Sequence, residues 1–286
     1  VPPAAPSRPS DAAVQRLLVK VGMGSFEEAV GARELQWIRN DLDAEDAKVV
    51  AYVVAVSGSL VTLYLNDNKI GDEGAMTLAA SVASSRSLSH LNLDSNNICD
   101  DGARALAAGV ATSSSLITLS LVMCGIGAAG AKALATGVAA SGSLSTLDLR
   151  NNNIGDAGAK ELAAGVAGSG SMADLRLNSN NIGDAGAKEL AGAIFSCGSL
   201  AALLLGGNNI GDDGSKALAA AVAASRSLTR LGLDNNNVGD DGARALATEL
   251  AASDSPSLLK ELYVPSRIVN HAELLAACNS RSIELK

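Results

Sequence analysis

The stretch LSTLDLRNNNIGDAGAKEL, residues 144–162, decides how this chain folds. Its frame, L-x-x-L-x-L-x-x-N-x-I-G-D-x-G-A-x-x-L, returns every 28 positions through most of the sequence, and a serine precedes each copy. The seven regular copies open at Leu60, Leu88, Leu116, Leu144, Met172, Leu200 and Leu228. A fixed period of this size indicates one supersecondary unit, copied and stacked so that each unit contacts only its neighbours.

The first part of the frame predicts a short strand followed by a turn. In L-x-x-L-x-L the alternation places the last two leucines on one side and the residue between them on the other. The asparagine lies where the chain turns, and its amide can bond backbone groups of that turn and of the next coil to form a buried ladder. We therefore interpret the asparagines as structural rather than as ligand contacts. They are Asn68, Asn96, Asn152, Asn180, Asn208 and Asn236.

The second part of the frame, from G-D-x-G-A onward, predicts a helix. Aspartate is a preferred N-cap residue, and the small residues after it let the helix lie close to its neighbour. The expected capping residues are Asp72, Asp100, Asp156, Asp184, Asp212 and Asp240. Because strands stack at about 4.8 Å and helices at roughly 10 Å, the stack should bend, with parallel strands on the concave face and helices on the convex face.

This frame resembles the ribonuclease-inhibitor-like class of leucine-rich repeat proteins, which also supplies the repeat regions of NOD-like receptors and of the Ran GTPase-activating protein. The resemblance covers about residues 32–270. It implies an α/β fold, a right-handed leucine-rich repeat solenoid shaped like a horseshoe. It implies no particular activity, because members of the class bind very different partners.

Both ends of the chain depart from the frame. Asp11 should cap a short helix and Ser25 should begin another, while Trp37 stands in a leucine position of a worn copy of the unit. There its large apolar area can shield the end of the core. The predicted organisation is a disordered Pro-rich segment over 1–10, an N-terminal helical cap and degenerate repeat over 11–58, seven regular repeats over 59–252, and a degenerate repeat and cap over 253–286.

The C-terminal end begins with an insertion at Ser253–Ser257, after which the pattern restarts imperfectly. Its apolar positions are Leu259, Leu262, Val264 and Val269. We expect a last helix over about 270–278 and a short strand over 283–285 to close this end.

Composition limits the classes of partner. Apolar residues make up 48% of the chain but aromatic residues only 2%, so the core has to be built from Leu, Ile, Val and Ala. A net charge of −8 and a pI near 4.8 disfavour a nucleic-acid partner, because such proteins normally carry a basic patch or stripe. The longest apolar run, Val49–Val56, is too short for a membrane span.

The four cysteines bear on metal binding and compartment. They show no C-x-x-C spacing and no nearby histidine pair, which argues against a zinc site. Thiols without a pairing pattern suggest a reducing, intracellular compartment, and we predict the cytoplasm. The Pro-rich start at Val1 also fits a mature end left by transit-peptide removal, which would place the protein in an organelle. For Cys99 and Cys124, in neighbouring coils, we expect buried or half-buried thiols rather than a bridge.

No residue set points to catalysis, a cofactor or a metal ion. The two histidines, His90 and His271, fall in no acid–base or nucleophile motif, and no Gly-rich turn has the spacing of a phosphate loop. The run from Asp234 resembles a calcium loop, but Val238 and Ala245 stand where an EF-hand needs its fifth-position ligand and its glutamate. We therefore predict a protein that is not an enzyme.

A basic residue recurs once in each helix. The series is Arg104, Lys132, Lys160, Lys188, Lys216 and Arg244. All but Lys132 lie four residues after an expected capping aspartate, which predicts i, i+4 ion pairs on a solvated face. Lys132 lacks that partner because Ala128 replaces the aspartate. We favour this interpretation over a positively charged binding ladder.

The candidate binding residues are those on the outward side of the strands, because these positions owe nothing to the frame and their variety is available for recognition. One set, between the two strand leucines, includes Tyr64, Asn92, Ser120, Asp148, Arg176 and Leu204. A second set, just after the second leucine, includes Asn66, Asp94, Val122, Arg150 and Asn178.

The third regular unit departs most from the frame. Val122–Gly125, which includes Met123, replaces the polar run found in the other units. An apolar spot with Asp94, Asp148 and Arg150 on its flanks could anchor a side chain of a partner. The alternative is neutral drift in one coil, with cysteine filling the asparagine position, and the sequence leaves both open.

Three functions fit these observations. The first is a non-enzymatic protein-interaction module or scaffold that binds a protein partner through the concave strand face. The second, from the resemblance, is a GTPase-activating or regulatory protein similar to the Ran activator, although the chain has fewer units and lacks that family's acidic tail. The third is a fixed peripheral subunit of a larger, organellar assembly.

Overall fold

The computed structural model describes residues 6–252 and 258–286. Two predictions therefore concern parts outside the described residues: disorder over residues 1–5, and the insertion at 253–257. Residues 6–10 precede the first helix and form neither helix nor strand.

The described residues form one parallel sheet whose strands follow one another in chain order. The strands are β1 (Glu34–Gln36), β2 (Thr62–Tyr64), β3 (His90–Asn92), β4 (Thr118–Ser120), β5 (Thr146–Asp148), β6 (Asp174–Arg176), β7 (Ala202–Leu204), β8 (Arg230–Gly232), β9 (Glu261–Tyr263) and β10 (Glu284–Leu285). Each pair is parallel, and the frame positions of one coil meet the same positions of the next. The stacked parallel sheet that the repeat predicted is confirmed.

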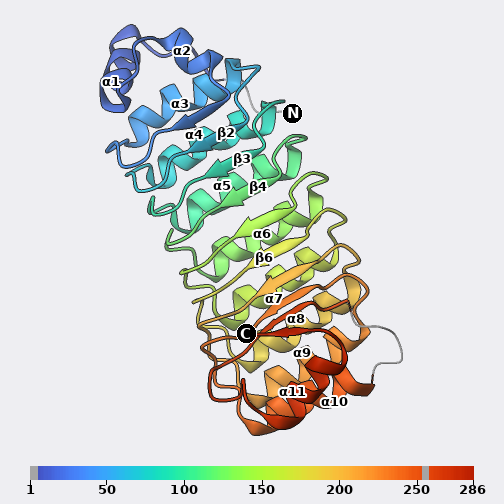
Figure 1. The fold of residues 1–286 in the computed structure, drawn as a ribbon. Helices are drawn as coiled ribbons and strands as arrows, with labels where there is room; N and C mark the ends of the chain where they lie inside the picture. Colours follow the sequence, from blue (N-terminus) through green and yellow to red (C-terminus); the bar gives the residue numbers. More distant parts are fainter. Residues whose placement is uncertain (1–5, 253–257) are drawn as a thin grey trace.

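Helices alternate with these strands and lie along the other side of the stack (Figure 1). They are α1 (Asp11–Val21), α2 (Phe26–Gly31), α3 (Ala44–Val56), α4 (Gly71–Ser84), α5 (Cys99–Thr112), α6 (Ala128–Ala140), α7 (Gly155–Ala167), α8 (Asp184–Ser196), α9 (Asp212–Ala224), α10 (Asp240–Ala252) and α11 (Ala272–Ser280). Figure 1 shows an elongated solenoid of coils, each a strand, a turn and a helix.

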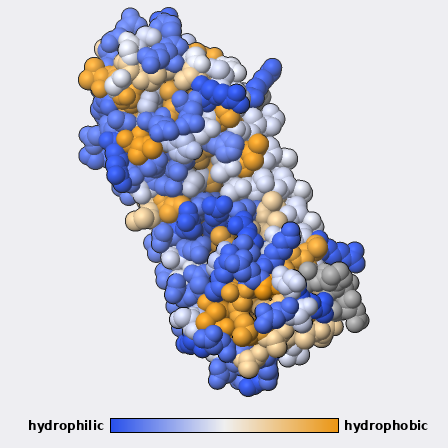
Figure 2. Space-filling view, in the orientation of Figure 1, coloured by the Kyte–Doolittle hydropathy of each residue, from blue (hydrophilic) through white to orange (hydrophobic). Residues whose placement is uncertain are grey.

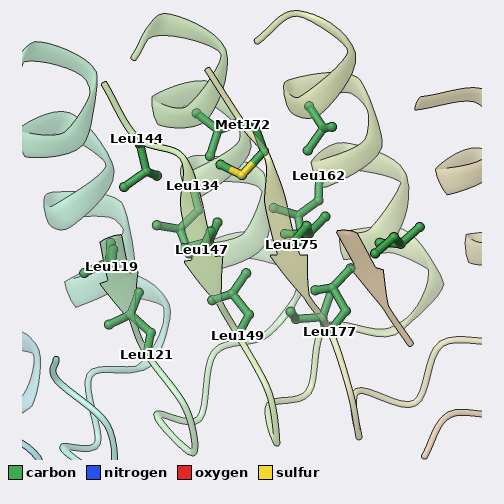
Figure 3. Packing of buried hydrophobic residues seen from close by; sticks show 14 of the residues in the cluster. Leu119, Leu121, Leu134, Leu144, Leu147, Leu149, Leu162, Met172, Leu175 and Leu177 are labelled. Atoms are coloured by element: carbon green, nitrogen blue, oxygen red, sulfur yellow. The ribbon is translucent and has the colours of Figure 1, made fainter. Parts of the chain in front are cut away.

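The core runs the length of the stack between the sheet and the helices. In Figure 3, Leu147 and Leu149 from one coil and Leu175 from the next point towards the helices, where Leu162 meets them. These side chains are at most 1% exposed. Trp37 occupies its leucine position at the N-terminal end and is buried, as predicted.

The asparagine ladder is present, but it points towards the preceding coil. Asn152 donates to the carbonyls of Leu121 and Leu149, both at 2.9 Å. Its carbonyl oxygen accepts from the amides of Cys124 and Ile126 at 3.1 and 3.0 Å. The structural role is confirmed, whereas the predicted bond to the next coil is wrong, because the turn of the preceding coil holds the unpaired amides.

The frame aspartates of α4, α5, α7, α8 and α9 do not cap their own helices, so that prediction is wrong for these five. The start of α7 has no side-chain cap. Asp156 instead accepts from the amides of Gly183 and Gly186 in the next coil, at 2.7 and 2.9 Å. The aspartates that bond the next coil in this way are Asp72, Asp100, Asp156, Asp184 and Asp212. Each therefore links two coils.

The glycine after each of these aspartates is required by close packing. A Cβ on Gly158 would lie 2.5 Å from Ile154 Cγ2 and 3.0 Å from Ala131 Cβ. Farther along the same helix, a Cβ on Gly165 would lie 2.4 Å from the carbonyl oxygen of Ala135. Small residues thus let adjacent helices approach closely, as the frame predicted.

The predicted terminal helices are confirmed with small corrections. Ser10, not Asp11, caps α1, because its hydroxyl accepts from the amide of Ala13. Ser25 caps α2 as expected. At the other end Ile268 is buried in the core, while Val269 is only half-buried.

Candidate recognition surface on the strands

The outward side chains of the strands form three rows, which we call the strand face. The first row holds the first residue of each strand from β2 to β8, namely Thr62, His90, Thr118, Thr146, Asp174, Ala202 and Arg230. The second row holds the third residue, namely Tyr64, Asn92, Ser120, Asp148, Arg176, Leu204 and Gly232. The third row lies two residues farther on, at Asn66, Asp94, Val122, Arg150, Asn178, Gly206 and Asp234.

The structure places ten of the predicted site residues in the second and third rows. Strand register aligns the second row, and backbone hydrogen bonds continue this alignment past the strand ends. Met123 lies outside the rows, at a left-handed turn position with φ of 55°. The sequence interpretation missed the first row, although the period of two in a strand puts that residue on the same face.

The predicted apolar spot in the third regular unit is only partly accessible. Val122 is half-buried and Met123 is exposed, but Cys124 is buried and takes the place of an asparagine in the ladder. Its Sγ lies 3.3 Å from the carbonyl oxygen of Leu93. Burial raises the pKa of the Cys124 thiol to about 12. Any contact at this spot therefore falls to Val122 and Met123.

Asp94 organises the neighbouring part of the strand face. One of its oxygens accepts from Ser120 Oγ at 2.5 Å and from the amide of Val122 at 2.8 Å. The other accepts from Asn92 Nδ2 at 3.1 Å. This carboxylate holds four predicted site residues, itself included, in one hydrogen-bonded group.

A second polar group spans β5, β6 and β8. Asp148, which is buried, binds Arg150 Nε at 2.9 Å and Nη2 at 2.8 Å. Asp174 binds Arg176 Nη2 at 2.8 Å and Arg230 Nη2 at 3.2 Å. Arg176 Nη1 also lies 3.7 Å from Asp148. Two of these residues, Asp174 and Arg230, belong to the row that the sequence interpretation missed.

Hydrogen bonds within this group favour the charged forms of Arg150 and Arg176. The bond to Asp148 raises the pKa of Arg150, and the bond to Asp174 raises the pKa of Arg176. Burial acts in the opposite direction in both cases and is outweighed. The group thus presents positive charge beside the buried carboxylate of Asp148 and the half-buried carboxylate of Asp174.

Leu204 borders this group on an apolar part of the strand face. It pairs in register with Arg176 on one side and with Gly232 on the other. A Cβ on Gly232 would lie 3.2 Å from Leu204 Cδ2, so the absent side chain leaves Leu204 room. Figure 2 shows hydrophobic side chains gathered over the coils towards the C-terminal strands, with hydrophilic ones around them.

The basic residues of the helices pair with acids, but not with the acids predicted. Arg104 pairs with Asp101 three residues before it. Lys132 Nζ lies 3.1 Å from Glu161 of the next coil, although no partner was expected. The i, i+4 prediction is wrong because the frame aspartates already bond the amides of the next coil. These pairs are exposed, so each contributes little to stability.

A leucine-rich repeat family model matches residues 57–79, 84–107, 112–135, 141–163, 171–191, 198–219 and 224–247, together more than half of the chain. The chain belongs to the leucine-rich repeat family. Repeats of this family generally mediate protein–protein interaction, and the family is typically non-enzymatic.

Solved structures similar to this leucine-rich repeat chain include an internalin C2 from Listeria monocytogenes, at 19% identity over 70% of this chain and 85% of that one, with a TM-score of 0.42. Another is TLR13 in a complex with ssRNA13, at 20% identity over 77% of this chain and a TM-score of 0.41. The match covers 30% of the TLR13 chain. No curated protein sequence matches the chain significantly.

The described repeats offer few groups for chemistry. His90 Nδ1 lies 2.7 Å from Ser89 Oγ, but within residues 6–252 and 258–286 no carboxylate is recorded against the other ring nitrogen to orient the pair. In the same part of the chain, His, Cys, Asp and Glu side chains form no group of three suited to a metal ion. Cys99 is exposed, contrary to expectation, and Cys124 and Cys278 are buried; none of the cysteines is bridged. No described helix combines the length and apolar character that crossing a membrane requires.

Proposed function

We propose that this leucine-rich repeat chain is a non-enzymatic module that binds a protein partner through its strand face. One observation carries the proposal. The inward side chains of the regular coils follow one frame, whereas the outward side chains of the same strands differ from coil to coil. Repetition satisfies packing, which every coil shares, and a varied exposed surface suits one particular partner.

A paired comparison tests this proposal. The wild-type chain and the double variant Val122→Asp/Arg150→Glu are immobilised, and proteins bound from native extract are identified by mass spectrometry. The control, Lys160→Glu/Lys188→Glu, changes charge on the helix face, and circular dichroism verifies that each variant is folded. A protein retained by the control and lost from the strand-face variant supports the proposal. An identical set on all three proteins contradicts it.

The two alternative functions stay predictions. A GTPase activator would accelerate phosphate release from GTP-loaded small GTPases, and an unchanged rate would eliminate that function. A fixed subunit of an assembly would migrate far above 28.6 kDa in a native gel of the source extract. Migration at the monomer mass would count against it.

A further inference from the structure

We infer that the strand face from β5 to β8 binds a short acidic segment of a protein partner. A carboxylate of the partner would contact Arg150, Arg176 and Arg230, and an adjacent apolar side chain of the partner would contact Leu204. This inference rests on the proposed function and names the chemistry of the partner. We call these three residues the arginine diagonal. Arg150, just after β5, is in the third row, Arg176 on β6 is in the second row, and Arg230 on β8 is in the first row.

The acids of this group lie beneath its arginines. The side chains of Asp148 and Asp174 are 6% and 14% exposed, whereas those of Arg150, Arg176 and Arg230 are 44%, 34% and 40% exposed. With three arginines and two aspartates the group carries one net positive charge, and its arginine side chains are more exposed than its carboxylates. Its outer side therefore presents hydrogen-bond donors.

Several of these donors are not engaged. Arg150 uses Nε and Nη2 on Asp148, Arg176 uses Nε and Nη2 on Asp174, and Arg230 uses Nη2 alone. Within residues 6–252 and 258–286, no hydrogen bond is recorded for Nη1 of Arg150 or for Nε and Nη1 of Arg230. Guanidinium donors fit a carboxylate with two parallel bonds, and such charge-assisted bonds are strong.

The apolar part of the site adjoins the diagonal directly. Leu204 is half-buried and pairs in register with Arg176, and Arg230 pairs in register with Ala202 on one side and with Glu261 on the other. Gly206 and Gly232 lack side chains beside it. Because neighbouring strands lie about 4.8 Å apart, an acidic residue on Arg176 places the next residues of an extended segment over Leu204.

Charge around the site limits the acidic stretch to a few residues. Asp234 leans over Gly206, since its Oδ1 lies 2.5 Å from the position of a Cβ there, and Glu261 follows on β9. A nucleic-acid backbone needs a longer positive track than three arginines inside a chain of net charge −8. The arrangement favours a protein segment in which Asp or Glu stands next to a large aliphatic residue.

Peptide binding measured by fluorescence anisotropy tests this inference. The probes are labelled peptides of roughly ten residues with a central Glu-Leu, Lys-Leu or Glu-Ser pair, and a labelled single-stranded oligonucleotide. We expect the Glu-Leu peptide to bind at least about tenfold more tightly than the Lys-Leu peptide, and its affinity to fall as salt rises. Absence of binding by the Glu-Leu peptide, or equal binding by the oligonucleotide, would overturn the inference.

Three variants locate the contact. Arg230→Gln, which removes only one recorded hydrogen bond, should weaken the Glu-Leu peptide about fivefold or more. Leu204→Ser should abolish the preference for Glu-Leu over Glu-Ser, and Lys160→Gln/Lys188→Gln on the helices should leave binding unchanged. Unaltered binding by both strand-face variants would overturn the inference. Loss of captured protein partners from Val122→Asp/Arg150→Glu, in the absence of any peptide binding, would still support the proposed function.

Discussion

At one position of the frame, the interior coils carry a residue without a side chain and the first coil carries a charged residue. Interior coils carry glycine there, as at Gly158, because the preceding coil lies against it. The first coil has no coil before it and carries Asp46, which is fully buried. The Asp46 carboxylate binds Arg16 Nη2 at 2.8 Å and Lys20 Nζ at 2.6 Å, both from α1.

This difference shows that the residue demanded by a repeat position depends on its neighbour as well as on the unit itself. Where a coil stacks, the position has to be empty of side chain. Where stacking ends, the same position is open, and a carboxylate there can anchor a covering helix. Asp46 also accepts from the amide of Asp43, which completes a capping box at the start of α3.

The largest loss of stability is expected when the aspartate of the first coil is introduced at the glycine position of an interior coil. Gly158→Asp would bury a carboxylate with no cation beside it and would force a Cβ against Ala131. We expect a loss of about 4 kcal/mol or more in unfolding free energy, measured by denaturant unfolding. The matched control is Gly192→Asp, at an exposed helix position with nothing within 4 Å. Equal losses for both variants would disprove the comparison.

Removing the anchor at the end should cost less, because water reaches its partners. Asp46→Ala removes the buried partner of Arg16 and Lys20, but both cations are partly exposed and keep Asp43 nearby. We expect a loss of about 2–3 kcal/mol and faster hydrogen exchange confined to α1 and α3. Exchange that accelerates equally in α7 and α8 would show that Asp46 does not act locally.

The hydrogen bonds from the frame aspartate to the next coil can be tested by making the same Asp→Ala change separately in two coils. Asp156→Ala removes bonds to the amides of Gly183 and Gly186 and should destabilise the protein by about 1–2 kcal/mol. Asp240→Ala changes the same frame position in the last regular coil, where no side-chain bond is recorded within the described residues. We expect its effect to stay below about 0.5 kcal/mol. Similar thermal shifts for the two variants would contradict the role of the next coil.

The smallest expected effect is the pH dependence of stability that arises from Asp43 at the N-terminal end. Burial raises the pKa of Asp43, but the amide of Asp46 and the charge of Arg16 lower it on balance. The unfolded chain therefore binds this proton first, and the contribution to stability is complete above about pH 4 and disappears as pH falls through the lowered value.

Asp43→Asn keeps a capping residue but removes the charge, so its comparison with wild type isolates this contribution. Because Asp43 is half-exposed, we expect a difference of only about 0.5 kcal/mol at about pH 7, vanishing near about pH 2. Unfolding midpoints at several pH values measure it. A difference that stays constant down to about pH 2 would show that the Asp43 charge is not responsible.

Local patterns predicted the elements well, and longer-range partners poorly. The leucine alternation located each strand, the start of a helix at Ser25 was predicted correctly, and the 28-residue period placed Trp37 in a leucine position of the first coil. The capping role of Asp156 was misassigned because its partners lie 27 and 30 residues later, and a helix start offers a nearer set of amides. The i, i+4 pairs failed for the same reason, since the aspartate was already bonded across the coils.

The strand face shows the same limit. Most of the candidate residues share one face as the period of two predicts. Asp174 and Arg230 were not predicted, because they precede the first strand leucine, whereas the predicted positions lie between and after the leucines. Their pairing spans 56 residues, through Arg230 Nη2 and Asp174 Oδ2. Local sequence spacing does not predict this contact, because the two residues meet only when two further coils have stacked.

The repeated spacing by itself determined the unit, the parallel order of the strands and the leucine core, because these depend on interactions that every coil makes alike. Tertiary structure alone decided which carboxylate meets which amide or guanidinium, and which side of a residue remains open. Those outcomes depend on the distance between neighbouring coils, which the one-dimensional pattern does not contain. They also leave the arginines of the strand face more exposed than Asp148 and Asp174.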